Sequence, residues 1–439
     1  MGGDVQIQYG PAVLEDNQDD GYSPYEVKLE NSVFHITKIK KVLKLRVMII
    51  TVASDSFKGS LSSREVAETV RGALLEALPG CEVHCLEMAD GGEGLVQALA
   101  PALGAEVVSA RVHDPLGRPV EARYAVDGER AIIEMAAASG LTLLEKRERD
   151  VMKASSQGLG ELILDALGRG CRDFVIGVGG SATNDAGTGM LGALGWRFLD
   201  SEGKPVPAGG GYLERIARID ASAADGRLRE ARFRVACDVD NPFYGPEGAA
   251  VVFAPQKGAN PEQVEALDRG MRHFASLVQA GAGAASVRDG AGPDLQAVPG
   301  SGAAGGVGGA LYAFLAAPLQ SGAQIVLDAL GFDAVAAKSD LVITGEGCLD
   351  GQSLRGKACY AVLERCRALD VPVLALCGIV RDQAAVAGAG FKKILPVKPG
   401  GQSIEEAMRP DVAKANIRKA VKSLFGPGGS FRSPSPGKV

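Results

Sequence analysis

Short apolar segments alternate with helix-like segments along most of this chain, and this alternation constrains the fold more than any other feature. The apolar segments end in glycines, acids or lysines, which is typical of buried strands that lead into loops. The alternation predicts an α/β fold with a mostly parallel sheet. The expected strands are 47–53, 82–88, 131–135, 174–178, 234–237, 249–253, 341–344 and 371–377, and the expected helices are 63–77, 158–167, 261–280 and 357–369.

Length, charge and cysteine content set the broad class. A chain of 439 residues is longer than one hydrophobic core usually supports, so we expect two domains. The formal net charge of −6 gives no overall attraction to nucleic acid or to an anionic membrane. The 8 cysteines include no C-x-x-C pair, and no signal peptide or long apolar run is visible, so we expect a cytoplasmic protein with reduced thiols. Residues 1–47 are expected to be an extension outside the main fold, and 426–439 a disordered tail.

Loops rich in acids, lysines and glycines follow the expected strands. Ligands of open α/β sheets bind outside the carboxyl ends of the strands, so we expect these loops to converge in space. An ordinary turn or helix cap with solvated side chains is the alternative interpretation of each acidic or basic loop. The six loops carry Asp55 and Lys58; Asp90 and Glu93; Gly179, Gly180, Ser181, Asn184 and Asp185; Asp238 and Asp240; Lys257; and Glu346, Asp350 and Lys357.

The loop after the strand 174–178 is the richest in glycine. Glycines let backbone N–H groups approach an anion closely, so this loop indicates a phosphate-handling site. Residues 177–182 also match the dinucleotide fingerprint G-x-G-x-x-A, with Asp200 near the expected distance, which leaves an NAD-dependent oxidoreductase as an alternative. None of the four histidines lies in a glycine loop, which argues against a dehydrogenase. Residues 351–357 have Walker A spacing, but Ala358 stands where a hydroxyl should hold Mg²⁺.

Taken in order, the loop motifs resemble the bacterial type I glycerate kinase family over about residues 48–408. Three positions depart from the family pattern, namely Ser54 for proline, Ala186 for glycine and Cys348 for arginine. The loss of arginine at Cys348 removes a possible phosphate contact. The motifs that carry the resemblance are Asp55-Ser56-Phe57-Lys58, 88–94, 134–136, 179–185, 237–242, 255–258, 344–347 and 349–352.

The resemblance implies ATP-dependent phosphorylation of D-glycerate to 2-phospho-D-glycerate. It implies a Rossmann-like domain formed by 48–112 and 318–408, an α/β domain inserted at 113–317, and an active-site cleft between them. A non-catalytic sensor of a phosphorylated acid, which would bind ligand without turning over ATP, is a further alternative.

Site roles follow from what a kinase for a small acid needs. We expect Asp185, Lys58 and Asp55 to be catalytic, with Asp185 positioning or deprotonating the hydroxyl. Phosphate and substrate binding is assigned to Gly179, Gly180, Ser181, Asn184, Lys257 and Lys357, and Mg²⁺ binding to Asp238, Asp240, Glu346 and Asp350. The partner is expected to be a small molecule, and neither nucleic acid nor membrane.

Overall fold

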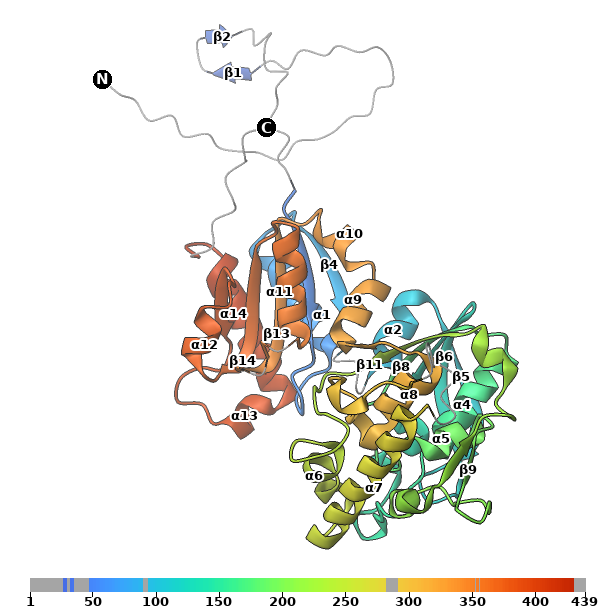
Figure 1. Ribbon diagram of the computed structural model, residues 1–439. Coiled ribbons are helices and arrows are strands. Elements are labelled where there is room, and N and C mark those ends of the chain that lie inside the picture. The colour runs from blue at the N-terminus through green and yellow to red at the C-terminus, as the bar shows by residue number, and fades with distance from the viewer. Residues whose placement is uncertain are drawn as a thin grey trace, which may run out of the picture. The chain divides into compact units, whose positions relative to one another are not determined.

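The computed structural model describes residues 47–89, 94–281, 291–351, 353–354 and 356–429, together with the backbone of two short strands before them. Contacts within the chain define two units, Met1–Val47 and Met48–Val439. In the first unit, β1 (Val27–Leu29) and β2 (Ser32–Phe34) pair antiparallel. All remaining elements belong to the second unit (Figure 1), which the contacts do not divide further. The expected division into a discontinuous domain and an inserted domain therefore stays a prediction.

A five-stranded parallel sheet is built from segments near both ends of the second unit. Its order is β15-β14-β13-β3-β4, so β3, the first strand of this unit, lies beside β13, which begins only at Leu341. Apolar side chains on one face pack against α1 and α14, and those on the other face against α9 and α11 (Figure 1). The bounds are β3 Ile49–Ser54, β4 Glu82–Glu87, β13 Leu341–Leu349, β14 Val373–Val380, β15 Lys393–Pro396, α1 Ser63–Ala77, α9 Gly322–Ala329, α11 Ala358–Ala368 and α14 Pro410–Phe425.

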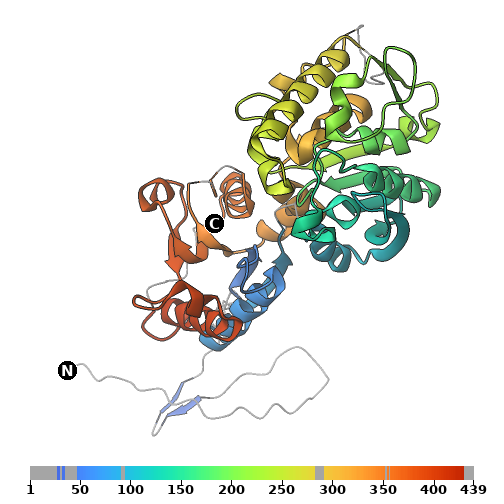
Figure 2. The same cartoon turned by 90° about the horizontal axis from the view of Figure 1, so that it is seen from below.

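A six-stranded mixed sheet has the order β12-β11-β8-β7-β6-β5. The strands from β12 to β7 are parallel, whereas β6 pairs antiparallel with both β7 and β5. Its largest core lies against helices α4, α5, α7 and α8, which Figure 2 shows from below. The bounds are β5 Glu106–His113, β6 Pro119–Asp127, β7 Arg130–Glu134, β8 Asp173–Gly177, β11 Arg232–Ala236, β12 Leu319–Gln320, α4 Gln157–Gly168, α5 Thr188–Ala193, α7 Pro261–Gln279 and α8 Val307–Leu315.

Shorter elements connect the two sheets or cover their edges. Helix α2 and α9 contribute to one apolar cluster that contains residues of both sheets. Strands β9 and β10 form a separate antiparallel pair. The bounds are α2 Leu95–Leu103, α3 Ala136–Ser139, α6 Ala249–Phe253, α10 Phe332–Ala336, α12 Gln383–Ala387, α13 Ile404–Met408, β9 Arg197–Leu199 and β10 Arg218–Asp220, with 3₁₀ turns at Leu141–Leu143, Lys146–Glu148, Gly210–Arg215, Gly226–Arg229, Pro255–Lys257, Leu295–Ala297 and Ala303–Gly306.

Helix α1 shows how local sequence sets an element. Ser62 is its N-cap: the Glu65 N–H donates to Ser62 Oγ at 3.2 Å, and the Ser62 N–H donates to Glu65 Oε2 at 3.1 Å. This reciprocal capping box satisfies two backbone donors that the helix itself leaves unpaired. Val66, Val70 and Leu74 are fully buried on the face that packs against the sheet.

The predicted α/β class with mostly parallel strands is confirmed, but one predicted strand is wrong. Residues 249–253 form helix α6, not a strand. A short apolar run does not by itself distinguish a buried strand from a buried helical turn. Here Ala249 and Ala250 are buried while Val251 and Val252 are 40% and 44% exposed, which is a helical pattern and not a two-residue alternation.

Candidate active site

A pocket of about 360 Å³ lies at the carboxyl ends of β3, β13 and β14, and we call it the β3–β13 pocket. From β3 the chain passes through α1 to β4 on one side, while β13 lies on the other side of β3. This reversal of strand order is the position where open α/β sheets bind ligands. The charged residues that line the pocket are Asp55, Lys58, Glu346, Asp350, Lys357, Arg381 and Lys398.

The loop after β3 is held against the neighbouring strand. The Asp55 N–H donates to the carbonyl oxygen of Gly345 in β13 at 2.8 Å. Asp55 is 6% exposed, and its Oδ1 accepts a hydrogen bond from the Ser56 N–H at 2.7 Å. A tight turn follows, in which the Phe57 N–H donates to the Leu61 carbonyl at 2.9 Å and Gly59 has φ of 75°. The turn presents Lys58 at the pocket, and these hydrogen bonds hold Asp55 in place at the same pocket.

Strand β13 and the loop after it supply further charged residues of the pocket, namely Glu346, Asp350 and Lys357. The Ser353 N–H donates to Asp350 Oδ1 at 3.1 Å, which closes a turn before α11. Lys357 is the N-cap residue of that helix. Gly347 and Gly378 pack tightly, because a Cβ on Gly378 would lie 2.4 Å from the Gly347 carbonyl oxygen. Glu346 lies within β13 itself, where it pairs with Cys377 of β14, whereas Asp350 and Lys357 lie in the loop that follows the strand.

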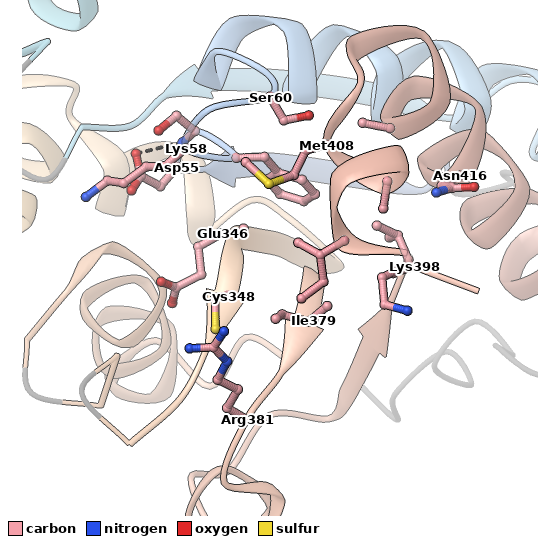
Figure 3. A pocket seen from close by; sticks show the side chains of 18 of the residues that line it. Asp55, Lys58, Ser60, Glu346, Cys348, Ile379, Arg381, Lys398, Met408 and Asn416 are labelled. Atoms are coloured by element: carbon pink, nitrogen blue, oxygen red, sulfur yellow. Dashed lines mark hydrogen bonds between the residues drawn. The ribbon is translucent and has the colours of Figure 1, made fainter. Parts of the chain in front are cut away.

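Figure 3 shows how the side chains are distributed along the β3–β13 pocket. Asp55, Lys58 and Glu346 lie at one end, and Lys398 and Asn416 at the other, with Ile379 and Met408 between them. The Cys348 sulfur lies beside the Arg381 guanidinium, which lowers the pKa of that thiol less than burial raises it. The pocket is therefore charged at one end and apolar in its middle.

A second pocket of about 390 Å³, the glycine-loop pocket, lies at the carboxyl ends of β8 and β11. Gly179, Gly180 and Ser181 line it. Within the described residues, the N–H groups of Gly179 and Gly180 donate to no main-chain oxygen. Such N–H groups suit an anionic ligand. Its other lining residues are Leu141, Val178, Ala236, Cys237, Asp238, Val239, Phe253, Gln256, Lys257, Ala303 and Ala304.

Lys257 is buried behind the glycine loop, although it also lines that pocket. Its Nζ donates to Ser181 Oγ at 2.8 Å and to the Thr183 carbonyl oxygen at 2.7 Å. Burial lowers the pKa of Lys257 to about 7, and the nearby carboxylate of Asp185 partly opposes this shift. Lys257 therefore fixes the shape of the loop directly.

Asp185 is fully buried and lines neither pocket. Its Oδ2 accepts hydrogen bonds from the N–H and Oγ of Ser156, both at 2.8 Å, and from the Gly189 N–H at 3.1 Å, and its Oδ1 accepts from the Gly187 N–H at 3.2 Å. Burial raises the pKa of Asp185 despite these hydrogen bonds. This geometry does not favour the predicted contact with a substrate hydroxyl, because the carboxylate is already used in holding the start of α5 to α4.

Asn184 is also fully buried, and neither polar atom of its side chain has a partner in the described part of the chain. Behind it, a Cβ on Gly305 would lie 2.2 Å from the Thr183 carbonyl oxygen and 2.4 Å from Asn184 Cα. Gly305 has φ of 68° and follows Ala304, which has φ of 55°. Only glycine permits this main-chain contact.

Asp238 connects the two pockets. Its Oδ1 accepts hydrogen bonds from the Gly322 N–H at 2.9 Å and from Ser321 Oγ at 3.3 Å, and Ser321 Oγ also contacts the Gly356 carbonyl at 2.8 Å. Gly356 precedes Lys357, which lines the other pocket. The loop after β11 is thus joined through Ser321 to the loop after β13.

The predicted convergence of six loops is only partly observed. The β3–β13 pocket gathers Asp55, Lys58, Glu346, Asp350 and Lys357, whereas Gly179, Gly180, Ser181, Asp238 and Lys257 line the glycine-loop pocket. Asp240 lines neither, and Asp90 and Glu93 lie outside the described residues.

The four acids predicted to bind Mg²⁺ are therefore divided. No cluster of three or more potential metal ligands occurs among the residues that the structure describes. Glu346 and Asp350 still fit the ion, because Mg²⁺ in kinases is held by one or two carboxylates together with substrate phosphates and water.

One wall of the β3–β13 pocket was missed by the sequence analysis. It consists of Gly378, Ile379, Arg381, Val397, Lys398, Ile404, Ala407, Met408, Ala413 and Asn416. The strand at 371–377 was predicted. Because ligands of open α/β sheets bind outside the carboxyl ends of the strands, that strand could have indicated Gly378 and Arg381 as pocket residues. The residues from α13 and α14 carry no such signal.

The fold and this pocket define an α/β protein with a partly charged and partly apolar ligand site at the switch point of a parallel sheet. Residues 50–426 match the model of the glycerate kinase family. Glycerate kinase of Bacillus subtilis strain 168 is 44% identical over 363 residues, which cover 82% of this chain and 93% of the relative. Glycerate 2-kinase of Escherichia coli K12 is 41% identical over 380 residues, covering 86% and 97%.

A solved structure agrees with these matches. The crystal structure of a Salmonella typhimurium LT2 protein, assigned to glycerate kinase 2, matches with a TM-score of 0.74 and 40% identity, and covers 86% of this chain and 97% of that one. The chain belongs to the glycerate kinase family. The family resemblance found in the sequence, and with it the assignment to enzymes, is confirmed.

The structure also explains why the dinucleotide fingerprint misleads. That motif requires a helix to open at its last positions so that the pyrophosphate meets the helix N-terminus. After β8 the next helix, α5, begins only at Thr188 and is 6 residues long.

In the part of the chain that is described, none of the helices has both the length and the apolar character needed to cross a membrane.

Proposed function

We propose that the protein is an ATP-dependent kinase that phosphorylates D-glycerate, with 2-phospho-D-glycerate as the product. Membership of the glycerate kinase family supports the substrate and the reaction. The observation that carries the proposal is the β3–β13 pocket, which is lined by Asp55 and Lys58 from the loop after β3, by Glu346 from β13, and by Lys357 from the loop after β13. Carboxylates and cations together at a sheet switch point suit phosphoryl transfer, which depends on positioning and charge stabilisation. The predicted cytoplasmic location suits an enzyme that draws on ATP.

Within this pocket we assign roles by position. Lys58 and Lys357 neutralise the transferring phosphoryl group or the glycerate carboxylate. Asp55, fixed by its hydrogen bond to the Ser56 N–H, orients and deprotonates the attacking hydroxyl. Glu346 and Asp350 hold Mg²⁺, which supplies charge neutralisation on the phosphates when bound.

The glycine-loop pocket receives a second anionic group of the substrates. Gly179, Gly180 and Ser181 offer it main-chain N–H groups and a hydroxyl. Asn184, Lys257 and Asp185 shape the loop from behind. For Asp185 this replaces the role of base, because its oxygens are occupied by hydrogen bonds within the protein. The contact chain from Asp238 through Ser321 to Gly356 supports joint use of the two pockets.

The direct test measures ADP release from ATP and Mg²⁺ with D-glycerate, with L-glycerate and without acceptor, and identifies the product by ³¹P NMR. Turnover dependent on D-glycerate, with phosphate on the carbon-2 oxygen, is the expected result. Phosphate on the carbon-3 oxygen would correct the product, and absence of turnover with either glycerate enantiomer would refute the function.

A further inference from the structure

Two large apolar side chains on α13 are exposed at the mouth of the β3–β13 pocket. Ile404 is 50% exposed and Met408 is 40% exposed, and both line the pocket. They are four residues apart, so they lie on the same side of the helix. Single exposed apolar residues are ordinary, whereas apolar side chains gathered around a cavity are typical of the lining of ligand sites.

The opposite side of the same space is also apolar. Phe57 and Val397 are buried in its wall, and Ile379 projects from the end of β14 (Figure 3). The turn after β3 contacts α13, since a Cβ on Gly59 would lie 2.9 Å from Met408 Cε, and this contact closes one side of the space. The result is an apolar slot between α13 and the end of β14, open to the charged end of the pocket (Figure 3).

Polar groups lie at the far end of the slot (Figure 3). Asn416 Nδ2 donates to Gln402 Oε1 at 2.8 Å, which orients the amide and leaves Oδ1 as an acceptor. Lys398 Nζ donates to the carbonyl oxygens of Pro399 at 3.3 Å and Gln402 at 2.7 Å, so its charge is held by main chain. A ligand that fits this sequence of environments has an anionic tail, a flat apolar body and a hydrogen-bond donor at its outer edge.

We propose that this slot binds the adenine ring of ATP, with Ile404 and Met408 covering one face and Asn416 accepting a hydrogen bond from the exocyclic amine. The inference rests on the proposed kinase function for the identity of the nucleotide. It places the triphosphate toward Lys58, Lys357 and Arg381 at the charged end. It also predicts base selectivity, because guanine presents a carbonyl oxygen where adenine presents the amine, and that oxygen would face Asn416 Oδ1.

The test is calorimetric binding to the full chain, without glycerate, of the non-hydrolysable analogue AMP-PNP and of inorganic tripolyphosphate. The double variant Ile404→Gln with Met408→Gln should bind AMP-PNP about tenfold or more weakly, because apolar contact with the base is lost, while tripolyphosphate affinity stays within about twofold. Leu75→Gln is the matched control, since Leu75 is 43% exposed on α1 and should leave both affinities unchanged. Unchanged AMP-PNP affinity in the double variant, or an equal loss for both ligands, would overturn the inference.

A second variant tests the edge of the slot. Asn416→Leu should reduce the preference for ATP over GTP in binding by about tenfold, whereas an unaltered preference would remove Asn416 from base recognition. Failure of the proposed kinase function and failure of the adenine slot give different results. Loss of AMP-PNP affinity in the double variant, in a protein that never turns over glycerate, supports the slot and refutes the function. Normal turnover with normal AMP-PNP affinity in that variant refutes the slot alone.

Discussion

Lys257 Nζ lies 2.8 Å from Ser181 Oγ and joins the glycine loop to a turn that follows it far along the sequence. The same amine contacts the Thr183 carbonyl, so one buried side chain holds two positions of the loop. A buried lysine is costly unless its donors are paired or its charge is lost, and both conditions operate here. The loop that presents N–H groups to a ligand is thus braced from inside the protein.

Lys257→Met should change how stability depends on pH. The pKa of Lys257 is about 7 in the folded protein against 10.5 for the free side chain. Between these values the unfolded chain binds the extra proton, so the contribution of this residue to the free energy of unfolding rises with pH. The free energy of unfolding of the wild type minus that of Lys257→Met, measured by urea denaturation at pH 6, 7, 8, 9 and 10, should be lowest at pH 6 and should increase above pH 7. A difference that is flat over this range would mean that Lys257 titrates normally.

Asp185→Ala should destabilise the fold. It removes the acceptor of four hydrogen bonds and leaves buried donors at Ser156, Gly187 and Gly189 without partners. We expect a loss of about 3 kcal/mol or more in the free energy of unfolding, measured by urea denaturation. Unchanged stability with a turnover number reduced by a factor of about 100 or more would instead return Asp185 to the role of base.

Asp55→Asn should reduce kcat by about 100-fold with little change in stability, because the amide keeps an acceptor for the Ser56 N–H but does not accept a proton. Coupled detection of ADP measures kcat. Asp411→Asn is the control, since that side chain is 68% exposed on α14. Full activity in Asp55→Asn would exclude Asp55 as the base.

Glu346→Gln should weaken the use of Mg²⁺. A neutral amide is a poorer ligand than a carboxylate, so the Mg²⁺ concentration for half-maximal activity should rise by roughly tenfold. Excess EDTA should abolish activity of the wild type reversibly. Glu364→Gln, on the exposed side of α11, controls for loss of a nearby charge. Identical Mg²⁺ curves for the wild type and Glu346→Gln would show that Glu346 does not bind the metal.

Ser62→Ala should cost about 1 kcal/mol in the free energy of unfolding, because the Glu65 N–H at the start of α1 loses its acceptor. Ser423→Ala, late in α14, is the control and should be nearly neutral, as its hydroxyl only contacts the Ala420 carbonyl on the surface. Equal effects in thermal or urea denaturation would contradict the cap.

Local signals in the sequence determined much of the fold. The start of α1 was predictable because Ser62 and Glu65 form a cap with near neighbours, and the strand at 174–178 because a β-branched run ends in glycines. The strands β5 and β6 were not predicted, although β5 pairs with β6 and β6 with β7, because their apolar residues alternate with polar ones and form no continuous apolar run. For 249–253, burial on one helical face decided between two structures that a five-residue apolar run permits equally.

The candidate site was predictable where it follows strands. Lys58, Glu346 and Lys357 were predicted as loop residues, and all three line one pocket, although Glu346 lies within β13, which is longer than the predicted strand at 341–344. The sequence did not reveal which side chains are buried. Asp185 and Lys257 have the same loop context as Lys58 and Lys357, yet both are buried. Ile404 and Met408 gave no signal because α13 reaches the pocket only through tertiary packing. Burial and long-range contact are properties of the assembled chain.

The contact between Gly305 and the main chain of Thr183 and Asn184 bears on the thermodynamics of ligand binding. A loop rich in glycine would ordinarily lose much conformational entropy when a ligand orders it. Here that entropy is already lost when the protein folds, because main chain presses on the loop from behind and Lys257 ties it in place. The free loop is therefore preorganised, and an anion that enters its pocket gains the interaction energy with little further ordering of the protein.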